Sequence, residues 1–429
     1  MEFKMKLTDE QKAILNGRDG EVMAKVMETV VMYGDIFGAE KLVPVTHADG
    51  HLVTSFGISL MKPLFSTMEK LNAAGIKTKG KLTVDPRPLE YENVKCNLLE
   101  KIGFHVMYSK QKEYEEQLMK VGLRDRDSFT CTCYLDEVGN QPKKGDVLSW
   151  AESSAVVFAN SVLGARCNRN SGMLDLFGSI IGYVPYFGLV TDEGRKATWK
   201  VYVKTTSKPE AQILGSAIGM KVMEEVPYVY GLDQWIGNEL NDETVSYLKD
   251  FGAATASNGA VGLYHIDGLT PEAKESGEAL ITEDAKTYII DDEELERVYK
   301  SYPVMWKNPD AKPNLCFIGC PHLSYRQLCN WTEILEKSLN ETGRNKVVRT
   351  TIMTTSPQVK KKFMATPYYQ KLTGMGVKVA SICPLMFTNN PMTKKRVILT
   401  NSNKLRTYST ARYFKDEKIA AIITGKEGI

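Results

Sequence analysis

The chain has 429 residues, which is enough for two or three domains. Its 43% hydrophobic and 25% charged residues are typical of a globular protein, and its net charge of +3 excludes the strong basic excess of a dedicated nucleic-acid binder. Because the sequence has no run of eighteen apolar residues and its charged start lacks the apolar core of a secretory signal, we expect no membrane span and a cytoplasmic location.

The N-terminal part alternates helices with short strands. Thr8 can cap a helix over residues 8–33, with Gln11 at the capping-box position three residues on. An apolar run at 41–45 predicts a strand that leads into a polar turn with His47, a common place for site residues in α/β proteins. The other predictions here are helices at 66–74 and 113–121 and a strand at 81–84.

The middle of the chain predicts a helix over 149–163 that is rich in small apolar residues. Gly215 and Gly219 lie within a second helical pattern, so close helix packing explains them better than phosphate binding. The remaining predictions are strands at 194–203 and 261–266, helices at 209–223, 242–251 and 293–302, and a small-residue segment at 252–262.

The last third, after a plausible linker at 303–313, alternates strands with helices. This pattern predicts a parallel sheet, and the whole chain is predicted to be α/β. We predict three regions: 1–130, 131–304 and 305–429. The predicted strands of the last region are 315–318, 346–353, 377–382, 396–399 and 419–424, and its predicted helices are 324–339 and 356–372.

The eight cysteines are dispersed over the chain, and a disulfide framework is not expected in a cytosolic protein. Cys320 and Cys383 each precede a proline at the end of a predicted strand, so the two thiols could face one site; two buried cysteines before turn prolines are an equal alternative. A third thiol would favour an iron–sulfur cluster, and Cys131 is the best placed, between a strand and a polar loop. The spacings around Cys131 and Cys320 are not those of common zinc sites.

Two arginines follow the small-residue helix. Arg166 and Arg169 have planar donors that suit a carboxylate or a phosphate, and their buried-looking flanks favour an anion site over a solvated helix end. His265 follows another small-residue stretch, and by itself it indicates a core histidine with satisfied hydrogen bonds.

Taken together, these segments resemble the large subunit of the aconitase X family, a branch of the aconitase superfamily of hydro-lyases. The matching stretches run through nearly the whole chain in order. They are residues 7–34 with Gly38 and Ala39, the His47 turn, 152–166 with Asn168 and Arg169, 265–273, 319–322, Cys383, and 400–402 with Lys404 and Tyr408.

The resemblance implies three α/β/α domains around a cleft and an iron–sulfur cluster ([4Fe-4S] or [2Fe-2S]) at its base. It also implies a small swivelling domain that is absent from this chain and forms a partner subunit, and that carries the catalytic base, typically a serine. On this basis we expect cluster ligands at Cys131, Cys320 and Cys383. The substrate-binding residues would be Arg166, Asn168, Arg169, Thr270 and Lys404, and the catalytic residues lining the cleft would be His47, Ser153 and His265.

The implied reaction is dehydration of a small hydroxy acid, with cis-3-hydroxy-L-proline as the first expectation and mevalonate 5-phosphate as the alternative. An alternative of another class is a non-catalytic iron–sulfur redox or regulatory protein. The chain departs from the family pattern at Cys133, at Cys167 and at Asn403 before Lys404. These departures lie where a substrate would be contacted, so they concern the substrate more than the reaction class. No nucleic-acid or membrane partner is expected.

Overall fold

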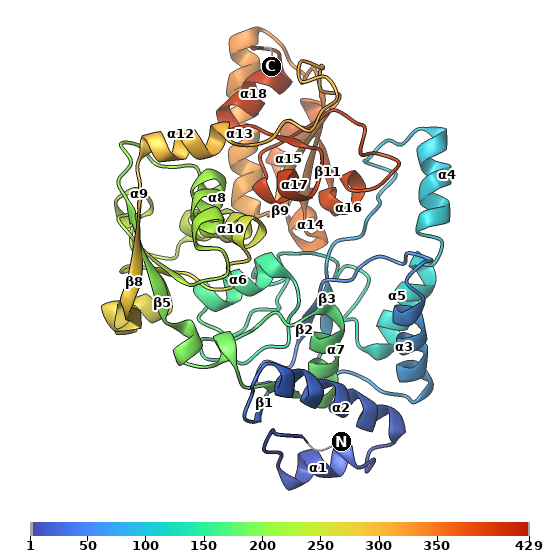
Figure 1. Ribbon diagram of the computed structural model, residues 1–429. Helices are drawn as coiled ribbons and strands as arrows, with labels where there is room; N and C mark the ends of the chain where they lie inside the picture. The colour runs from blue at the N-terminus through green and yellow to red at the C-terminus, as the bar shows by residue number, and fades with distance from the viewer. Residues whose placement is uncertain (1–2, 428–429) are drawn as a thin grey trace.

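The strands form a four-stranded sheet, a five-stranded sheet and two short strand pairs, each packed with helices (Figure 1). This arrangement is seen in a computed structural model that describes residues 3–427. Both larger sheets are parallel throughout, so the predicted α/β class is confirmed. Figure 1 shows three α/β domains, the first in blue to green, the second in green to yellow and the third in orange to red.

The first domain contains a parallel pair, β2 with β3, and an antiparallel pair, β1 with β4. The predicted capping box of Thr8 and Gln11 is present, but a turn at 16–20 divides the predicted single helix into two. The elements are α1 (Asp9–Leu15), α2 (Glu21–Ile36), β1 (Leu42–Pro44), β2 (Gly50–Leu52), α3 (Lys62–Ala73), β3 (Leu82–Val84), α4 (Leu98–Met107), α5 (Gln111–Val121), α6 (Ser153–Ser161), α7 (Gly172–Ile181) and β4 (Tyr183–Pro185).

The second domain has the sheet order β7-β6-β5-β8. Helices α8 and α10 pack closely there: a Cβ on Gly219 would lie 2.6 Å from the Thr255 carbonyl oxygen, which confirms the helix-packing interpretation. The small-residue segment after residue 251 continues α10. The elements are β5 (Ala197–Val203), α8 (Ala211–Val222), β6 (Pro227–Tyr230), α9 (Asp233–Ile236), α10 (Asp242–Gly259), β7 (His265–Ile266), α11 (Pro271–Ser276), β8 (Ile281–Ile290) and α12 (Asp292–Lys300).

The third domain has the sheet order β11-β10-β9-β12-β13, with β9 fully buried at its centre. The predicted strand at 419–424 is wrong, because these residues belong to a helix that begins with two acidic residues and packs against α13. The elements are β9 (Leu315–Leu323), α13 (Tyr325–Thr342), β10 (Thr350–Thr355), α14 (Pro357–Met364), α15 (Pro367–Gly374), β11 (Lys378–Ala380), α16 (Pro384–Thr388), β12 (Ile398–Thr400), α17 (Asn403–Tyr408), β13 (Arg412–Tyr413) and α18 (Asp416–Thr424).

Strand β9 is interrupted by a bulge. Ile318 pairs with Met353 and Leu323 with Thr355, so the four residues 319–322 stand opposite Thr354 alone. Gly319 begins the bulge with φ 105°, and a Cβ there would lie 2.6 Å from the Thr354 carbonyl oxygen, so only glycine fits. The bulge moves Cys320 out of the regular strand.

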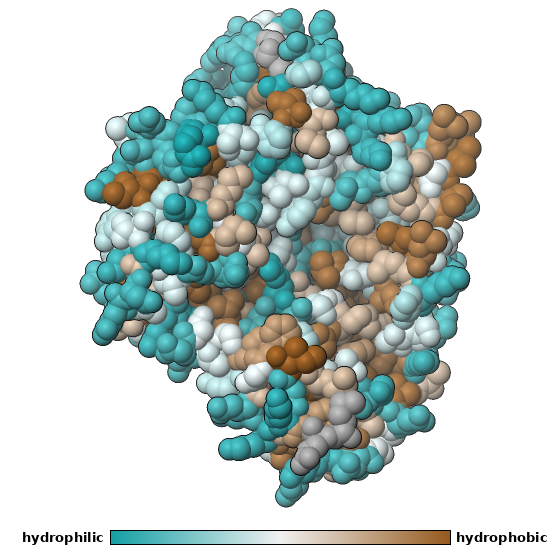
Figure 2. Space-filling view, viewed as in Figure 1, coloured by the Kyte–Doolittle hydropathy of each residue, from teal (hydrophilic) through white to brown (hydrophobic). Residues whose placement is uncertain are grey.

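Helix α4 carries an apolar outer face. Its Phe104 packs inward against Phe387 of the third domain, with ring centroids 5.8 Å apart. Figure 2 shows a brown patch over this helix at the upper right, and four large apolar side chains of the helix are more than half exposed. They are Leu98, Leu99, Ile102 and Val106. Within residues 3–427, no helix is both long and apolar enough to span a membrane.

Candidate active site

Three cysteines from distant parts of the chain converge beside the third-domain sheet. Cys320 lies in the β9 bulge, Cys383 is the N-cap of α16, and Cys131 accepts a hydrogen bond from the backbone N–H of His322 at 3.4 Å. Burial and then the neighbouring charge of Cys320 raise the pKa of Cys383. Burial raises the pKa of Cys131 well above its usual range, and Cys320 is among the charges that add to this. The predicted grouping of the three thiols is therefore present.

The three sulfur atoms suit a cluster better than a single ion. In the described part of the chain, His51, Asp85 and Glu152 are the only three potential ligands whose donor atoms all lie within 4.8 Å of one another. At least two of the three sulfur atoms therefore lie more than 4.8 Å apart. A single tetrahedral ion brings thiolate ligands to within roughly 4 Å of one another, since each metal–sulfur bond is about 2.3 Å. Thiolates are also the usual ligands of iron–sulfur clusters. The donor set thus fits a polynuclear iron–sulfur centre.

A buried ion pair lies beside these thiols. Glu152 caps helix α6 by accepting from the Ala155 N–H at 2.6 Å, and the Lys404 ammonium on α17 donates to its carboxylate. The Lys404 Nζ also lies 3.5 Å from the Ser153 Oγ. Burial alone would raise the pKa of Glu152, but Lys404 and the Ser154 hydroxyl lower it to about 2. Both charges are therefore present at neutral pH, and the structure brings the predicted residues Ser153 and Lys404 together.

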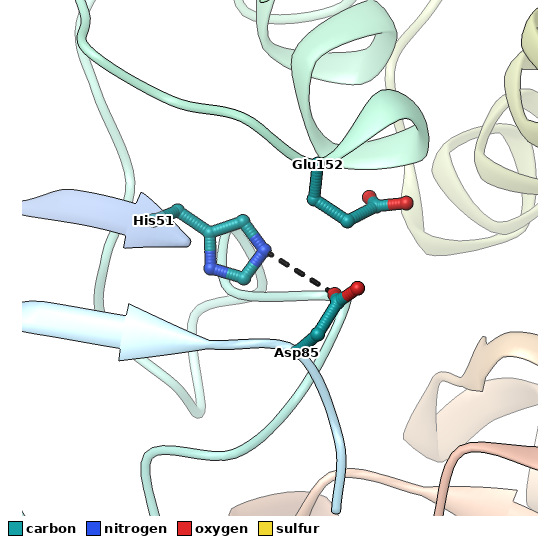
Figure 3. A group of neighbouring side chains, drawn as sticks. All are labelled: His51, Asp85 and Glu152. Carbon is teal, nitrogen blue, oxygen red and sulfur yellow. Dashed lines mark ion pairs between the residues drawn. The ribbon is translucent and has the colours of Figure 1, made fainter. Parts of the chain in front are cut away.

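His51 and Asp85 face Glu152 in the same space (Figure 3). The His51 Nε2 lies 3.8 Å from the Asp85 Oδ1, and neither atom has a hydrogen-bond partner among residues 3–427. Burial lowers the pKa of His51 to about 4, so the ring is neutral at pH 7. Burial, and then the charge of Glu152, raise the pKa of Asp85 well above its usual range. Two neighbouring carboxyl groups with pKa values moved in opposite directions are typical of an acid and an ionised partner at a catalytic site.

These three residues suit proton transfer better than a second metal ion. The Glu152 oxygens already accept hydrogen bonds from Ser154, the Ala155 N–H and Lys404. The Lys404 charge would also repel a cation there. The two unpaired atoms, His51 Nε2 and Asp85 Oδ1, remain available for a polar group of a substrate.

An open cavity of about 650 Å³ adjoins the ion pair through Ser153. Arg169 lines it, and Arg169 has no ion-pair partner within the described residues. Ser171 lines it as well and is the N-cap of α7, where backbone N–H groups favour an anion. A cation, hydroxyl groups and a helix N-terminus line this cavity and suit a bound carboxylate or phosphate, although Glu224 also contributes a carboxylate to the lining.

Two predicted anion-binding residues are used elsewhere. Arg166 forms an ion pair with Asp192 at 2.5 Å and donates to the Val190 carbonyl oxygen. The Asn168 side chain donates to the Phe187 carbonyl oxygen at 2.9 Å and accepts from the Leu189 N–H at 2.7 Å. Both side chains fix the loop before β5, so a substrate contact for either would require them to exchange these partners.

His265, Thr270 and His47 also have structural partners. The His265 ring donates from Nε2 to the Arg195 carbonyl oxygen at 2.8 Å, which agrees with a satisfied core histidine. The Thr270 Oγ1 accepts from the Ile266 N–H at 3.0 Å. His47 donates to the Asn140 side-chain oxygen at 2.8 Å. None of these bonds involves the three thiols, and the catalytic or binding roles of these residues stay predictions.

Sequence reasoning missed His51, Asp85 and Glu152. Asp85 directly follows strand β3, and Glu152 is the one acidic residue at the start of an apolar helix; both are signals that could have been used. His51 gave no such signal, because β2 has three residues and its pairing with Thr83 of β3 appears only in the fold.

Comparison with known proteins gives consistent matches along the chain. The aconitase X first-domain model matches residues 4–193, the second-domain model 197–300 and the third-domain model 313–421. The crystal structure of the holo-form of Thermococcus kodakaraensis aconitase X superposes with a TM-score of 0.81 at 30% identity, covering 99% of this chain and 100% of that chain.

Three curated relatives illustrate the range of similarity. The phosphomevalonate dehydratase large subunit of Thermococcus kodakarensis is 36% identical over 77% of this chain and 77% of its own length. The Methanosarcina mazei large subunit is 30% identical over 94% of this chain and 92% of its own length. The cis-3-hydroxy-L-proline dehydratase of Hypocrea jecorina is 26% identical over 95% of this chain, but the match covers 65% of that enzyme.

Proposed function

The chain belongs to the aconitase X family of hydro-lyases, and we propose that it is the large subunit of an enzyme that dehydrates mevalonate 5-phosphate. The observation that carries this proposal is the convergence of three thiols, the Lys404–Glu152 pair and the unpaired polar atoms of His51 and Asp85 in one region. The proposed substrate is the alternative of the sequence analysis and not its first expectation, cis-3-hydroxy-L-proline, because the phosphomevalonate dehydratase relatives are more similar to this chain.

The cavity lined by Arg169 and Ser153, with Lys404 next to Ser153, supports a substrate with two anionic groups. Mevalonate 5-phosphate carries a carboxylate and a phosphate, whereas hydroxyproline carries a carboxylate and an ammonium group. Lys404 lies 3.5 Å from the Ser153 Oγ, and Arg169 lines the same cavity as Ser153, so two cations lie near this serine. A substrate carboxylate would share Lys404 with Glu152. We assign the carboxylate to Lys404 and the phosphate to Arg169 with the N-terminus of α7.

Dehydration removes a proton from the carbon next to the carboxylate and the hydroxyl group from the following carbon. A cation at the carboxylate stabilises the charge that develops when the proton leaves. Asp85, which retains its proton at higher pH than an ordinary carboxyl, can give this proton to the departing hydroxide so that water leaves, with His51 orienting it. The family resemblance places the base on the swivelling domain, hence on the partner subunit.

The three cysteines would bind the cofactor that assists the loss of the hydroxyl group. An iron–sulfur cluster bound by Cys131, Cys320 and Cys383 would supply a Lewis acid for the leaving hydroxyl oxygen, because three thiolates leave one iron position open. The chain's own contribution is to place these thiols beside Asp85, since the Asp85 carboxyl group is close enough to affect the pKa of both Cys131 and Cys383.

A protein partner is supported by the relatives and by the surface. Several relatives are named large subunits, which implies a small one. The exposed apolar face of α4, made by Leu98, Leu99, Ile102 and Val106, is the kind of patch that commonly contacts another protein.

The test is co-expression with a small subunit under anaerobic conditions, followed by an assay of both substrates. We expect mevalonate 5-phosphate to be converted to an unsaturated acid whose new vinyl proton is visible by NMR. Conversion of cis-3-hydroxy-L-proline alone would reverse the substrate assignment. An assembled, iron-loaded complex that converts neither substrate would favour the non-catalytic alternative.

A further inference from the structure

We propose that His322 is a positioning residue whose ring connects the three cysteine-bearing segments and keeps their thiols in place for the cluster. This inference rests on the proposed iron–sulfur centre, because it concerns the residues that would bind it. His322 lies in the β9 bulge and has no exposed surface. None of the substrate or proton-transfer steps above uses it.

The ring makes two hydrogen bonds, one from each nitrogen. Its Nδ1 lies 3.1 Å from the Thr130 Oγ1, and its Nε2 lies 3.0 Å from the Ile382 carbonyl oxygen. The backbone N–H of the same residue donates to the Cys131 Sγ at 3.4 Å. One residue therefore makes three polar contacts with segments 191, 192 and 60 positions away.

Each contact is next to a proposed ligand. Thr130 directly precedes Cys131, Ile382 directly precedes Cys383, and His322 itself follows Cys320 by two residues. The ring thus fixes the distances between all three ligand-bearing segments without binding the cluster. Groups of this kind orient metal ligands, and their loss typically costs about 10–100-fold in metal affinity.

The two bonds set the tautomer of the ring. A carbonyl oxygen only accepts, so the Nε2 of His322 carries the proton that is donated to Ile382. In the neutral ring Nδ1 then accepts from the Thr130 hydroxyl, whose oxygen also accepts from the Thr132 N–H at 3.1 Å. The hydrogen-bonded chain runs from the Cys131 segment through the ring to the Cys383 segment.

The geometry explains why other polar residues cannot replace this one. An asparagine has its polar atoms near the position of Nδ1, and a glutamine has them near the position of Nε2. Each replacement therefore retains one of the two bonds, and leucine retains neither. The backbone N–H to Cys131 is the same in all three variants, so only the ring contacts change.

The experiment compares His322→Asn, His322→Gln and His322→Leu in the anaerobically purified complex. The readouts are iron and sulfide per chain, the EPR spectrum, the rate of iron loss to a chelator, and the thermal unfolding of the iron-free protein. We expect His322→Leu to lose iron about 10–100-fold faster with an altered EPR spectrum, and the other two variants to be intermediate. His105→Asn, at an exposed histidine on α4, is the control and should match the wild type.

Thr130→Val keeps the test decisive if His322→Leu fails to fold. It exchanges one hydroxyl for a methyl group and leaves the ring in place. The change removes the Nδ1 partner together with the local hydrogen bonds of Thr130 to Thr132, and it should reproduce the faster iron loss of His322→Gln. Wild-type iron retention and an unchanged EPR spectrum in folded His322→Leu, or in Thr130→Val, would overturn the proposal. Iron retained in Cys320→Ser would instead overturn the cluster assignment, so the two failures are distinguishable.

Discussion

Lys404 and Glu152 form a buried ion pair between helix α17 of the third domain and the start of helix α6, 252 positions apart in the sequence. The Lys404 side chain is 12% exposed and that of Glu152 is 1% exposed, so water screens neither charge well. The pair holds the third domain against the first and keeps a positive charge next to Ser153.

Replacing Lys404 with methionine should lower both stability and activity. The change leaves the Glu152 carboxylate buried without its cation, which typically costs about 3–5 kcal/mol of unfolding free energy. We expect kcat/KM to fall at least about 100-fold, the effect of losing a charge stabiliser at a transition state. Urea unfolding and steady-state kinetics check the two effects. The Lys404→Met, Glu152→Gln double variant should regain much of the stability and none of the activity; a double variant as unstable as the single one would contradict the pairing.

Arg169→Ala should raise the KM for mevalonate 5-phosphate by about 10–100-fold, since a hydrogen bond to a charged group contributes about 1.5–3 kcal/mol. Arg166→Ala is the matched control, because Arg166 is occupied by Asp192 and the Val190 carbonyl oxygen. Its KM should stay near the wild-type value. Equal KM increases in the two variants would argue against the cavity as the phosphate site.

Cys320→Ala and Cys383→Ala should each remove most of the iron and the visible absorbance of the anaerobically purified complex. Cys316→Ala is the control on the same strand, since Cys316 is fully buried and belongs to a different apolar cluster from Cys320. Iron analysis of the three variants separates ligand loss from general damage to β9. Unchanged iron in both ligand variants would defeat the assignment.

Asp175 should make stability depend on pH. Burial raises its pKa to about 7 from the ordinary 3.8, even though Asn170 and Ser171 donate hydrogen bonds to it. Between these two pKa values the folded state therefore binds more protons than the unfolded state. The contribution of Asp175 to the free energy of unfolding is complete below about pH 4 and is lost as the pH rises through 7. Each pKa unit corresponds to about 1.4 kcal/mol, so the loss by pH 8 is about 4 kcal/mol.

Guanidinium unfolding of the wild type and of Asp175→Asn at pH 5 and pH 8 measures this effect. Asparagine cannot ionise, so the stability of the variant should change between pH 5 and pH 8 by about 3 kcal/mol less than that of the wild type, because only the two pH units between pH 5 and pH 7 fall within this range. Parallel pH profiles for the two proteins would show that another group causes the dependence.

Gly219→Ala should destabilise the α8–α10 contact. The added Cβ would lie 2.6 Å from the Thr255 carbonyl oxygen, and overpacking of this kind typically costs about 1–3 kcal/mol. Gly374→Ala at the end of α15 is the control, because a Cβ there has no neighbour within 4 Å, and it should stabilise by about 0.4–1 kcal/mol. Thermal unfolding of both variants tests whether close helix packing explains the glycine. A Gly219→Ala protein as stable as the wild type would leave that glycine without this role.

Much of the architecture could be predicted from local patterns. Strands such as β9 are continuous apolar runs followed by a capped helix, here with Ser324 at the N-cap of α13, and such units form parallel sheets. The segment at 419–424 misled because its isoleucines suit a strand in isolation. The segment is helical because Asp416 and Glu417 begin the helix and because the helix packs against α13. The packing against α13 cannot be read from a short stretch of sequence.

The parts of the site that could be predicted are the residues that lie at or near the ends of predicted strands. Cys320 lies near the carboxyl end of β9, and Cys383 follows β11, on the far side of β10 in the same sheet. Parallel strands end at the same edge of a sheet, so the two thiols are expected on one side of it. His51 and Asp85 could not be placed in the same way. Their meeting depends on the register of β2 with β3, in which His51 pairs with Thr83 two residues before Asp85. Lys404 was expected to bind a substrate, and its pairing with Glu152 depends on how two domains dock.

The distance along the chain between Cys131 and Cys383 sets the order in which the protein can mature. The first thiol lies within the residues matched to the first domain, and the other two lie within those matched to the third. A growing polypeptide has no complete set of three thiols until residue 383 has left the ribosome and the outer domains have docked. The proposed cluster, bound by all three thiols, would therefore be loaded after folding, and its acceptor would be a folded, metal-free protein.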